Sequence, residues 1–197
     1  KKLCKQNDVI TAIAQASDLY PCNQIYHTWD SKHPFNYNLS TEEQVAIKLI
    51  EYQSEYFHPV SIQTINKYGG KPSSNFGWRE GKMHNGVDID LDQWDSIFCA
   101  FPGVVRMARE YAGYGKVVIV RHYNGLETLY AHMQRMKVKS GQKVDAGTFL
   151  GFGGSTGHST GSHLHFEIRY KGVPINPKMV IDFTEQKLIS ETIPLQK

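Results

Sequence analysis

The chain has 197 residues, of which 40% are hydrophobic and 21% are charged, a balance typical of a folded protein and not of a disordered one. Lysine and arginine number 22 against 19 aspartates and glutamates, and the resulting net charge of +3 is too small to indicate a nucleic-acid partner. The longest apolar runs, such as residues 117–120, are only a few residues long, so we expect no membrane-spanning segment.

The cysteines and the start of the chain leave the cellular compartment open. Cys4, Cys22 and Cys99 form an odd set without C-x-x-C spacing, which argues against a cysteine-based structural zinc site. Cys4 and Cys22 flank a short segment and are able to form a disulfide in an oxidising compartment, whereas Cys99 is expected to be a buried thiol. No signal peptide is visible after Lys1 and Lys2, which fits a cytosolic protein or a mature exported one.

Residues 1–57 are expected to form a small N-terminal extension that is partly helical and partly irregular. Apolar residues near helical spacing predict a helix over residues 7–19. The segment 21–38 is rich in aromatic residues, which would leave large apolar areas in water if it were a solvated linker. We therefore expect residues 1–57 to pack on the domain that follows, either beside its functional site or on the back of its sheet.

The segment 40–52 supports two interpretations. Ser40 to Glu43 has the form of a capping box, which predicts a helix. The apolar residues Val45, Ile47 and Leu49 alternate with polar or small ones, which favours a strand. The local pattern leaves both interpretations open.

Residues 58–182 have the pattern of an all-β domain, and residues 183–197 that of a polar C-terminal tail. Short apolar runs alternate with glycine-containing turns about every ten residues. Asn124 and Gly125 form a strong β-hairpin signal between two of these runs. The predicted strands are Val104–Arg109, Lys116–His122, Glu127–His132, Lys143–Val144, Thr148–Gly151 and His163–Arg169.

The stretch from His163 to Arg169 has the clearest pattern, because titratable and apolar residues alternate strictly along it. Period two predicts a strand with one face in the core and one face lined with titratable groups. The Cα atoms of His163 and His165 would lie roughly 6.6–6.8 Å apart, which suits one metal ligand beside one group that acts on whatever the metal holds. A single histidine would indicate only a solvated face, whereas the pair favours a metal or catalytic site if further ligands exist.

Further ligands are offered by His84 and Asp88. A fully extended chain would place them about 13 Å apart, too far to share an ion, but Gly86 lies between them and permits a sharp bend. Together with the His-x-His pair they supply the two or three ligands of a zinc site with an open position. Imidazole and carboxylate donors without a thiolate favour zinc over magnesium. The spacing does not decide which of His163 and His165 binds the metal.

The run 127–133 adds a third element, a predicted strand with His132 near its end. A lone histidine at a strand end is more often structural than catalytic. A catalytic role for His132 is therefore supported only by the presence of the other candidate site residues. Alternation predicts that one face of this strand carries Thr128, Tyr130 and His132, and that the other carries Leu129, Ala131 and Met133.

The chain resembles the lysostaphin/LytM-type zinc endopeptidases, which cut peptide bonds in bacterial cell walls. The resemblance covers roughly residues 58–182, with its motifs in family order. These motifs are Phe76–Arg79, His84–Ile89, Tyr130–Met133, Val138–Val144, Gly154–Gly157, His163–Glu167 and Pro174–Pro177.

The resemblance implies a role for each candidate site residue. His84, Asp88 and His165 would bind a zinc ion (Zn2+), and His132 and His163 would be the two catalytic histidines. It implies hydrolysis of peptidoglycan stem peptides or cross-links by an endopeptidase. Peptidoglycan peptides would then be its partners, and its location would be extracytoplasmic, in the periplasm or cell envelope.

The resemblance also implies a mainly β fold, with an antiparallel β-sheet groove of the LytM/lysostaphin type, a duplicated hybrid motif that is barrel-sandwich-like. Zinc would lie on the groove floor, and residues 45–49 would form a strand. The chain departs from the family pattern at residues 94–97, at Pro102 and at Gly161–Ser162. These positions lie around the groove, so they bear on specificity more than on activity.

Two other functions fit less well. One is a catalytically inert relative that binds peptidoglycan or activates another cell-wall hydrolase. Such relatives typically lose a ligand, whereas this chain has all five site positions. The other is a purely structural zinc site, which leaves two additional histidines on the site face unexplained.

The remaining candidates receive structural interpretations. The segment Gly151–Gly161 is glycine-rich but lacks Gly-Lys-Ser/Thr, so it is expected to be a loop at the groove edge and not a phosphate cradle. Trp78 and Trp94 fit groove walls or ordinary packing equally well. If the N-terminal extension reached the groove, side chains able to take the metal's open position would be Asn23, Asp30, His33 and Asn36. Surface or packing roles are expected for His27, His33, His58, His122 and His158.

Overall fold

The computed structural model describes residues 58, 60, 69–122, 126–170 and 172–189. The expected extension over residues 1–57, the disulfide between Cys4 and Cys22 and the two alternatives for residues 40–52 therefore lie outside the described residues. Within the described part, no helix is both long enough and apolar enough to cross a membrane.

The described chain is mainly β and consists of antiparallel strands, as expected. Its strands are β1 (Gly77–Arg79), β2 (Lys82–His84), β3 (Val87–Asp90), β4 (Ser96–Phe98), β5 (Gly103–Glu110), β6 (Lys116–Arg121), β7 (Leu126–Met133), β8 (Arg135–Met136), β9 (Lys143–Val144), β10 (Phe149–Phe152), β11 (His163–Tyr170), β12 (Val173–Ile175), β13 (Ile181–Asp182) and β14 (Lys187–Leu188). Two short 3-10 helices are η2 (Ala112–Tyr114) and η4 (Pro177–Met179).

All six predicted strands are present, each with boundaries within one residue of the prediction. The strands that the sequence pattern does not reveal have only two to four residues, too few for a period-two signal. The predicted hairpin is also confirmed, because β6 and β7 pair antiparallel with Arg121 opposite Glu127. Its turn residues, 123–125, lie outside the described part of the chain.

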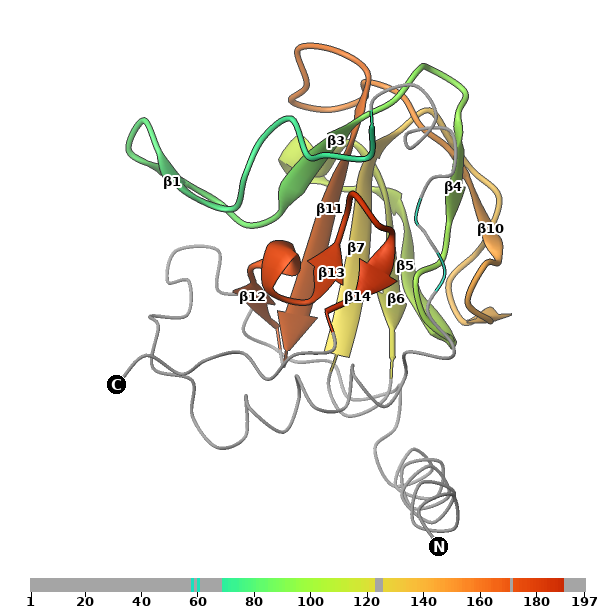
Figure 1. Cartoon of the computed structure of the whole chain (residues 1–197). Helices are drawn as coiled ribbons and strands as arrows, with labels where there is room; N and C mark the ends of the chain where they lie inside the picture. The colour runs from blue at the N-terminus through green and yellow to red at the C-terminus, as the bar shows by residue number, and fades with distance from the viewer. Residues whose placement is uncertain (1–57, 59, 61–68, 123–125, 171, 190–197) are drawn as a thin grey trace, which may run out of the picture.

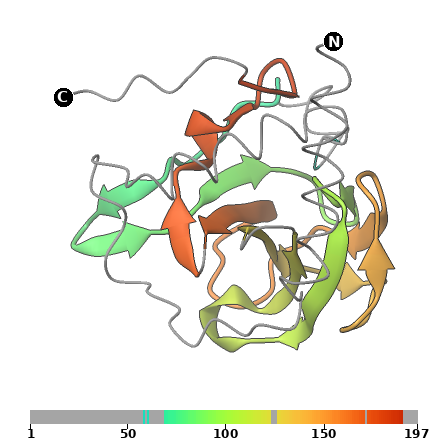
Figure 2. The ribbon, with the colours of Figure 1, turned by 90° about the horizontal axis from the view of Figure 1, so that it is seen from below.

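A seven-stranded antiparallel sheet forms the body of the molecule (Figure 1). The strand order is β12-β11-β7-β6-β5-β9, and β3 pairs with the same edge of β11 as β12 does. Seen from below, the strands curve around a common centre (Figure 2). The described strands do not close into a barrel, since the path ends at β12 and β9.

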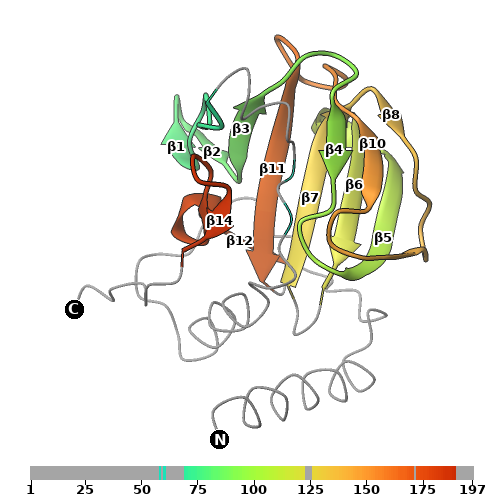
Figure 3. The ribbon, with the colours of Figure 1, turned by 45° about the vertical axis from the view of Figure 1, so that its right-hand side comes forward.

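Strand β11 lies between β3 on one side and β7 on the other (Figure 3). Its first half pairs with β3, so that His165 lies opposite Asp88. On its other side, His165 lies opposite Ala131 of β7. One strand therefore brings the candidate residues of β3 and β7 together.

The main core lies between this sheet and a second sheet of strands β4, β10 and β8. The apolar set of β11 is buried there as predicted, with Leu164 and Phe166 fully inaccessible to solvent. Cys99 is also fully buried, as expected for a thiol that behaves as a small hydrophobic residue. Each large apolar side chain buried in this way contributes about 1.5–3 kcal/mol to folding.

The opposite face of β11 carries the titratable groups, as predicted, and most of it is buried as well. Glu167 and Arg169 are 0% and 1% exposed. A second, smaller apolar cluster formed by β6 and β7 includes Leu129 and Ala131 on this side of the sheet. The titratable side chains of β11 therefore depend on internal partners and not on water.

The described part of the segment expected to be a polar tail packs on the domain. Strand β14 pairs with β13, and both Phe183 and Leu188 are buried in the main core. The Phe183 ring lies 6.2 Å from that of Phe166. The segment is polar on average, but these two apolar residues anchor it to the domain, so its composition did not predict the packing.

A series of buried hydrogen bonds links β6 and β7 to the residues that precede β5. His122 Nδ1 lies 2.9 Å from the Pro102 carbonyl oxygen, and its Nε2 lies 2.7 Å from Thr128 Oγ1. Thr128 Oγ1 lies 2.9 Å from the Tyr130 hydroxyl, which accepts a hydrogen bond from the Ala100 N–H. Because Nδ1 faces a carbonyl it carries the proton, and Nε2 is then free to accept. A neutral imidazole therefore satisfies every hydrogen bond in this series. His122 is thus a packing histidine, as expected.

This burial generates a prediction about stability at low pH. Burial lowers the pKa of His122 to about 4, although the Pro102 carbonyl favours the charged ring. The unfolded chain binds this proton near pH 6.5, so stability falls as the pH decreases from about 6.5 to about 4, by about 3 kcal/mol. In denaturant unfolding at several pH values, His122→Gln should lack this loss. Parallel pH profiles for the two proteins would contradict the assignment.

Candidate metal centre

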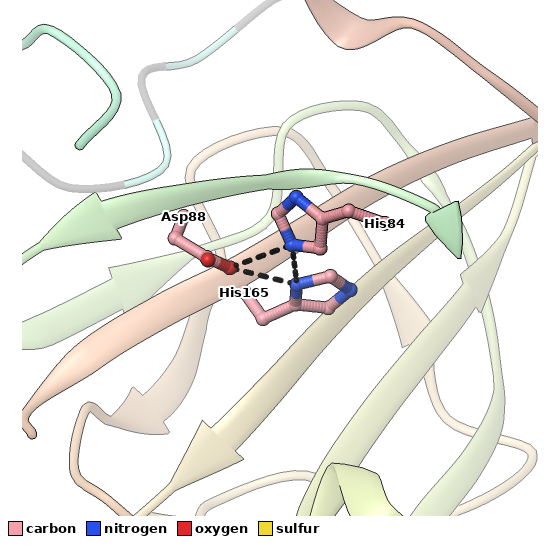
Figure 4. Close-up of side chains that lie close together, drawn as sticks. All are labelled: His84, Asp88 and His165. Carbon is pink, nitrogen blue, oxygen red and sulfur yellow. Dashed lines mark hydrogen bonds and ion pairs between the residues drawn. The ribbon is translucent and has the colours of Figure 1, made fainter. Parts of the chain in front are cut away.

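Three side chains from three strands converge on one point (Figure 4). His84 ends β2, Asp88 lies in β3, and His165 lies in β11. Asp88 Oδ1 is 3.0 Å from His84 Nε2 and 2.8 Å from His165 Nδ1, and the two nitrogens are 3.0 Å apart. The structure thus brings together the three residues predicted to be metal ligands.

Gly86 makes this convergence possible, but for a different reason from the one expected. Its backbone does not adopt the left-handed conformation that favours glycine. A Cβ atom at this position would instead lie 2.3 Å from the carbonyl oxygen of Phe166 and 2.8 Å from Cγ of Glu167. Glycine is therefore required because the bend between β2 and β3 presses against β11.

The partners of the two ligand histidines determine their tautomers. His84 Nδ1 lies 2.7 Å from the carbonyl oxygen of Asn75, which can only accept, so this nitrogen carries the proton. His165 Nε2 lies 2.9 Å from a carboxylate oxygen of Glu167 and donates to it in the same way. In the neutral rings, His84 Nε2 and His165 Nδ1 therefore turn lone pairs toward Asp88 Oδ1.

With both rings neutral, three electron-pair donors face one another, an arrangement that fits a cation. Two imidazole nitrogens and one carboxylate oxygen are the donor set of zinc sites that keep an open position. Hydrogen bonds from ligand histidines to a carbonyl and a carboxylate are the usual means of fixing such ligands. The residues present therefore fit a bound metal ion.

The same arrangement shifts the acidity of the cluster. Burial raises the pKa of Asp88, but hydrogen bonds and charge from His165 and His84 outweigh it and hold this pKa well below its usual range. Burial lowers the pKa of His165, yet Asp88 and Glu167 raise it to about 9. Both shifts reflect a strong preference for positive charge beside Asp88.

Behind His165 lies a hydrogen-bonded group of Glu167, Arg169 and Tyr114, for which the sequence predicted no role. Glu167 accepts hydrogen bonds from His165, from Arg169 Nε at 2.5 Å and from the Tyr114 hydroxyl at 2.9 Å. Burial raises the pKa of Glu167, but the Arg169 charge and the His165 hydrogen bond lower it to about 2. The alternation in β11 already placed Glu167 and Arg169 beside His165, whereas no local signal points to Tyr114.

His132 also reaches the site, although simple alternation predicts otherwise. Tyr130 packs in the main core against Phe166, with ring centroids 5.4 Å apart, and Ala131 lies on the opposite face. Regular alternation would return His132 to the core face, but its φ of +57° reverses the side chain. The ring lies 4.7 Å from that of His163. Met133 correspondingly lies in the main core. The prediction that His132 shares a face with Tyr130, and Met133 with Ala131, is therefore wrong.

His132 and His163 both direct one ring nitrogen away from the backbone. His132 Nδ1 lies 2.7 Å from the Thr156 carbonyl oxygen, and His163 Nδ1 lies 2.9 Å from that of Gly161. Each Nδ1 therefore carries a proton, and each Nε2 is left as a proton acceptor. His163 Nε2 is 3.7 Å from Asp88 Oδ1. Burial lowers the pKa of His132 to about 4, so this ring is neutral at pH 7.

A cavity of about 640 Å³ opens over this cluster. The segments that line it include residues 112–114 and 158–163, so the predicted loop at the groove edge contributes its second half. Residues 151–152 instead belong to β10. His158 is exposed at the surface, as expected, and it also lines the cavity.

The other aromatic candidates within the described residues lie outside the cavity lining. His58 packs against Phe98, with ring centroids 5.3 Å apart, as expected for a packing histidine. Trp94 meets the edge of Phe152 and is 51% exposed. Trp78 is 64% exposed. Neither tryptophan forms a wall of this cavity.

Comparison with known proteins identifies related sequences. Residues 82–177 match the model of Peptidase family M23. The DD-carboxypeptidase/endopeptidase Mpg of Neisseria meningitidis is 41% identical over 114 residues, which are 55% of this chain and 26% of that protein. The murein hydrolase activator NlpD of Salmonella dublin is 40% identical over 109 residues, 55% of this chain and 28% of that protein. The chain thus spans about a quarter of the length of these relatives.

Solved structures show the same fold. The catalytic domain of lysostaphin from Staphylococcus simulans has a TM-score of 0.55 at 26% identity, covering 61% of this chain and 96% of that one. A zinc containing peptidase from Vibrio cholerae has a TM-score of 0.54 at 28% identity, covering 61% of this chain and 39% of that one. The family match spans the strands that carry the candidate site. The catalytic domain of the M23 protein EnpA from Enterococcus faecalis, in a mutant form, has a TM-score of 0.51 at 33% identity, covering 54% of this chain and 88% of that one, and the chain therefore contains a Peptidase family M23 domain of the LytM/lysostaphin type.

Proposed function

We propose that this chain is a zinc-dependent endopeptidase that hydrolyses peptide bonds in peptidoglycan stem peptides or cross-links. The observation that carries the proposal is the convergence of three lone pairs, from His84, Asp88 and His165, beside two further imidazoles. The peptidoglycan DD-endopeptidase ShyA of Vibrio cholerae, 39% identical over 93 residues, supports the substrate class. The corresponding location is outside the cytoplasm, in the periplasm or cell envelope.

Zinc is the proposed ion because the donor set combines imidazole and carboxylate, and because a structural neighbour is a zinc containing peptidase. When bound, a zinc ion supplies Lewis-acid chemistry that polarises a carbonyl and makes water more acidic, toward a pKa of about 7. The protein's own residues then provide the proton transfers.

His132 and His163 are proposed to handle these protons. Each keeps Nδ1–H on a backbone carbonyl and so presents Nε2 to the cavity. One ring accepts a proton from water as the water oxygen attacks the peptide carbonyl carbon. That proton is returned to the leaving nitrogen as the C–N bond breaks. While it holds this proton, that ring can donate a hydrogen bond from Nε2 to the developing oxyanion and stabilise it.

A second function is an inert domain that binds peptidoglycan or activates another hydrolase. The likeness to the murein hydrolase activator NlpD favours it. The complete set of converging ligands, with both additional histidines in place, supports the enzyme instead. Metal content and turnover on defined muropeptides separate the two functions.

The first prediction concerns the ligands. Purified protein should contain about one equivalent of zinc, and Asp88→Ala should lose it because the only carboxylate donor of the cluster is removed. Asp90→Ala is the matched control, since it removes the same charge two residues further along β3. Metal analysis after dialysis checks both variants. Full metal content in Asp88→Ala would refute the assignment.

The second prediction concerns the two other histidines. His132→Ala and His163→Ala should keep their zinc, because neither side chain belongs to the converging donor set. Hydrolysis of muropeptides should fall by about 10²-fold or more, the usual effect of losing a general acid–base group. His58→Ala, which lies outside the cavity lining, should retain wild-type turnover. Wild-type rates in either site variant would exclude the proposed role.

The domain division is likewise a proposal, with an extension over residues 1–57, a metallopeptidase domain over residues 58–182 and a tail over residues 183–197. If the extension packs on the domain, limited proteolysis should spare residues 20–40 under conditions that cleave an unfolded chain. Activity with and without residues 1–57 then shows whether the extension affects the groove. Rapid cleavage there, with unchanged stability and activity of the remainder, would contradict docking.

A further inference from the structure

One wall of the cavity is provided by the β1–β2 hairpin. Arg79 ends β1 and lies opposite Lys82, which begins β2. The two residues between them, Glu80 and Gly81, have φ values of 49° and 74°, as in the tight type I′ turn. The other end of β2 is His84, so this short hairpin ties Arg79 to a proposed metal ligand (Figure 3).

The Arg79 side chain lines the cavity while remaining 53% exposed. Its Nη2 lies 3.5 Å from Asp88 Oδ2, the carboxylate oxygen that does not face the two histidines. Its Nη1 donates a hydrogen bond to Ser74 Oγ. Two contacts therefore hold the guanidinium beside the metal centre, while about half of its surface faces solvent.

Arg79 also contributes a permanent positive charge to the cavity. Among the described lining residues it is the only lysine or arginine, and the carboxylates there are Asp88 and Asp90. Asp90 accepts a hydrogen bond of 2.6 Å from the Ser73 hydroxyl. A divalent ion on the proposed ligands would make the sum of these charges positive. A cleft with an excess of positive charge attracts anions.

The position of Arg79 restricts which anion fits. An extended peptide advances about 3.3–3.6 Å per residue, and Arg79 touches the carboxylate that forms the metal site. A peptide whose carbonyl lies at the metal centre would therefore bring a group one or two residues away to the guanidinium. The planar guanidinium matches a carboxylate with paired hydrogen bonds.

We propose that Arg79 binds a free carboxylate of the substrate peptide, one or two residues from the bond that is cleaved. This inference rests on the proposed peptidase function and adds a substrate class, namely peptides with a carboxylate close to the scissile bond. The carboxylate is the α-carboxylate of a chain end or that of a side chain.

The experiment compares one muropeptide that the wild type cleaves with two matched forms of it. One form has its chain-end carboxylate converted to a carboxamide, and the other has its nearest side-chain carboxylate converted. The wild type should cleave the form that lacks the bound carboxylate about tenfold to hundredfold less efficiently in kcat/KM, since hydrogen bonds to charged groups have this effect. The sensitive form identifies which carboxylate Arg79 binds.

Arg79→Gln should abolish this preference. It should lose about tenfold to hundredfold in kcat/KM on the parent peptide and change little on the sensitive carboxamide form, with its zinc content retained. Lys82→Gln, which removes a positive charge from the opposite strand of the same hairpin, should keep the wild-type preference. Binding of the three peptides to zinc-loaded His132→Ala, with and without Arg79→Gln, should show the same pattern without turnover.

Equal losses of Arg79→Gln on all three peptides would overturn the inference, because they would mean that Arg79 acts only by orienting Asp88. Equal cleavage of the three peptides by the wild type would overturn it as well. Failure of the wild type to cleave any muropeptide would instead refute the proposed function, and the binding measurements would still test Arg79.

Discussion

The site depends on the antiparallel pairing of β3 with β11. This pairing sets Asp88 directly opposite His165, so a carboxylate and an imidazole meet within hydrogen-bond distance. His84 is added by the bend at Gly86, which has no room for a Cβ atom against β11. On the other edge of β11, β7 delivers His132. A register shift of one residue in β11 would turn His165 to the opposite face and separate it from His84 and Asp88.

Burying the three ligand side chains costs free energy, and the hydrogen bonds around them offset this cost. A buried carboxylate and two imidazoles lose hydration, which is favourable only when each polar atom has a partner. Asn75 and Glu167 take the outer nitrogens of the two histidines, and Arg169 in turn neutralises Glu167. The inner atoms then face one another, and a cation is the group that satisfies them together. The way in which the outer atoms are satisfied thus leaves the inner atoms suited to a cation.

Two further histidines and one arginine surround the three converging side chains, and they are held in different ways. His132 and His163 are fixed through Nδ1 to backbone carbonyls, so each ring orientation depends on the loop that supplies the carbonyl. His132 additionally requires a left-handed backbone conformation that few non-glycine residues adopt. A strained residue within a functional site is a usual feature of enzymes. Arg79 places the positive charge on a separate hairpin, where it can contact what enters the cavity.

The sequence by itself determined the β class, six strands to within one residue and the identity of the candidate ligands, because period two and residue chemistry are local properties. The local pattern left open which of His163 and His165 joins His84 and Asp88, and only the resemblance implied His165. The tertiary structure brings His165 to them, since the register of β11 against β3 sets His165 opposite Asp88 and His163 opposite Asp90. It also decided the reversal of His132, the need for glycine at position 86 and the support from Tyr114. Each of these arises from contacts between segments far apart in the chain, and no local pattern records such contacts.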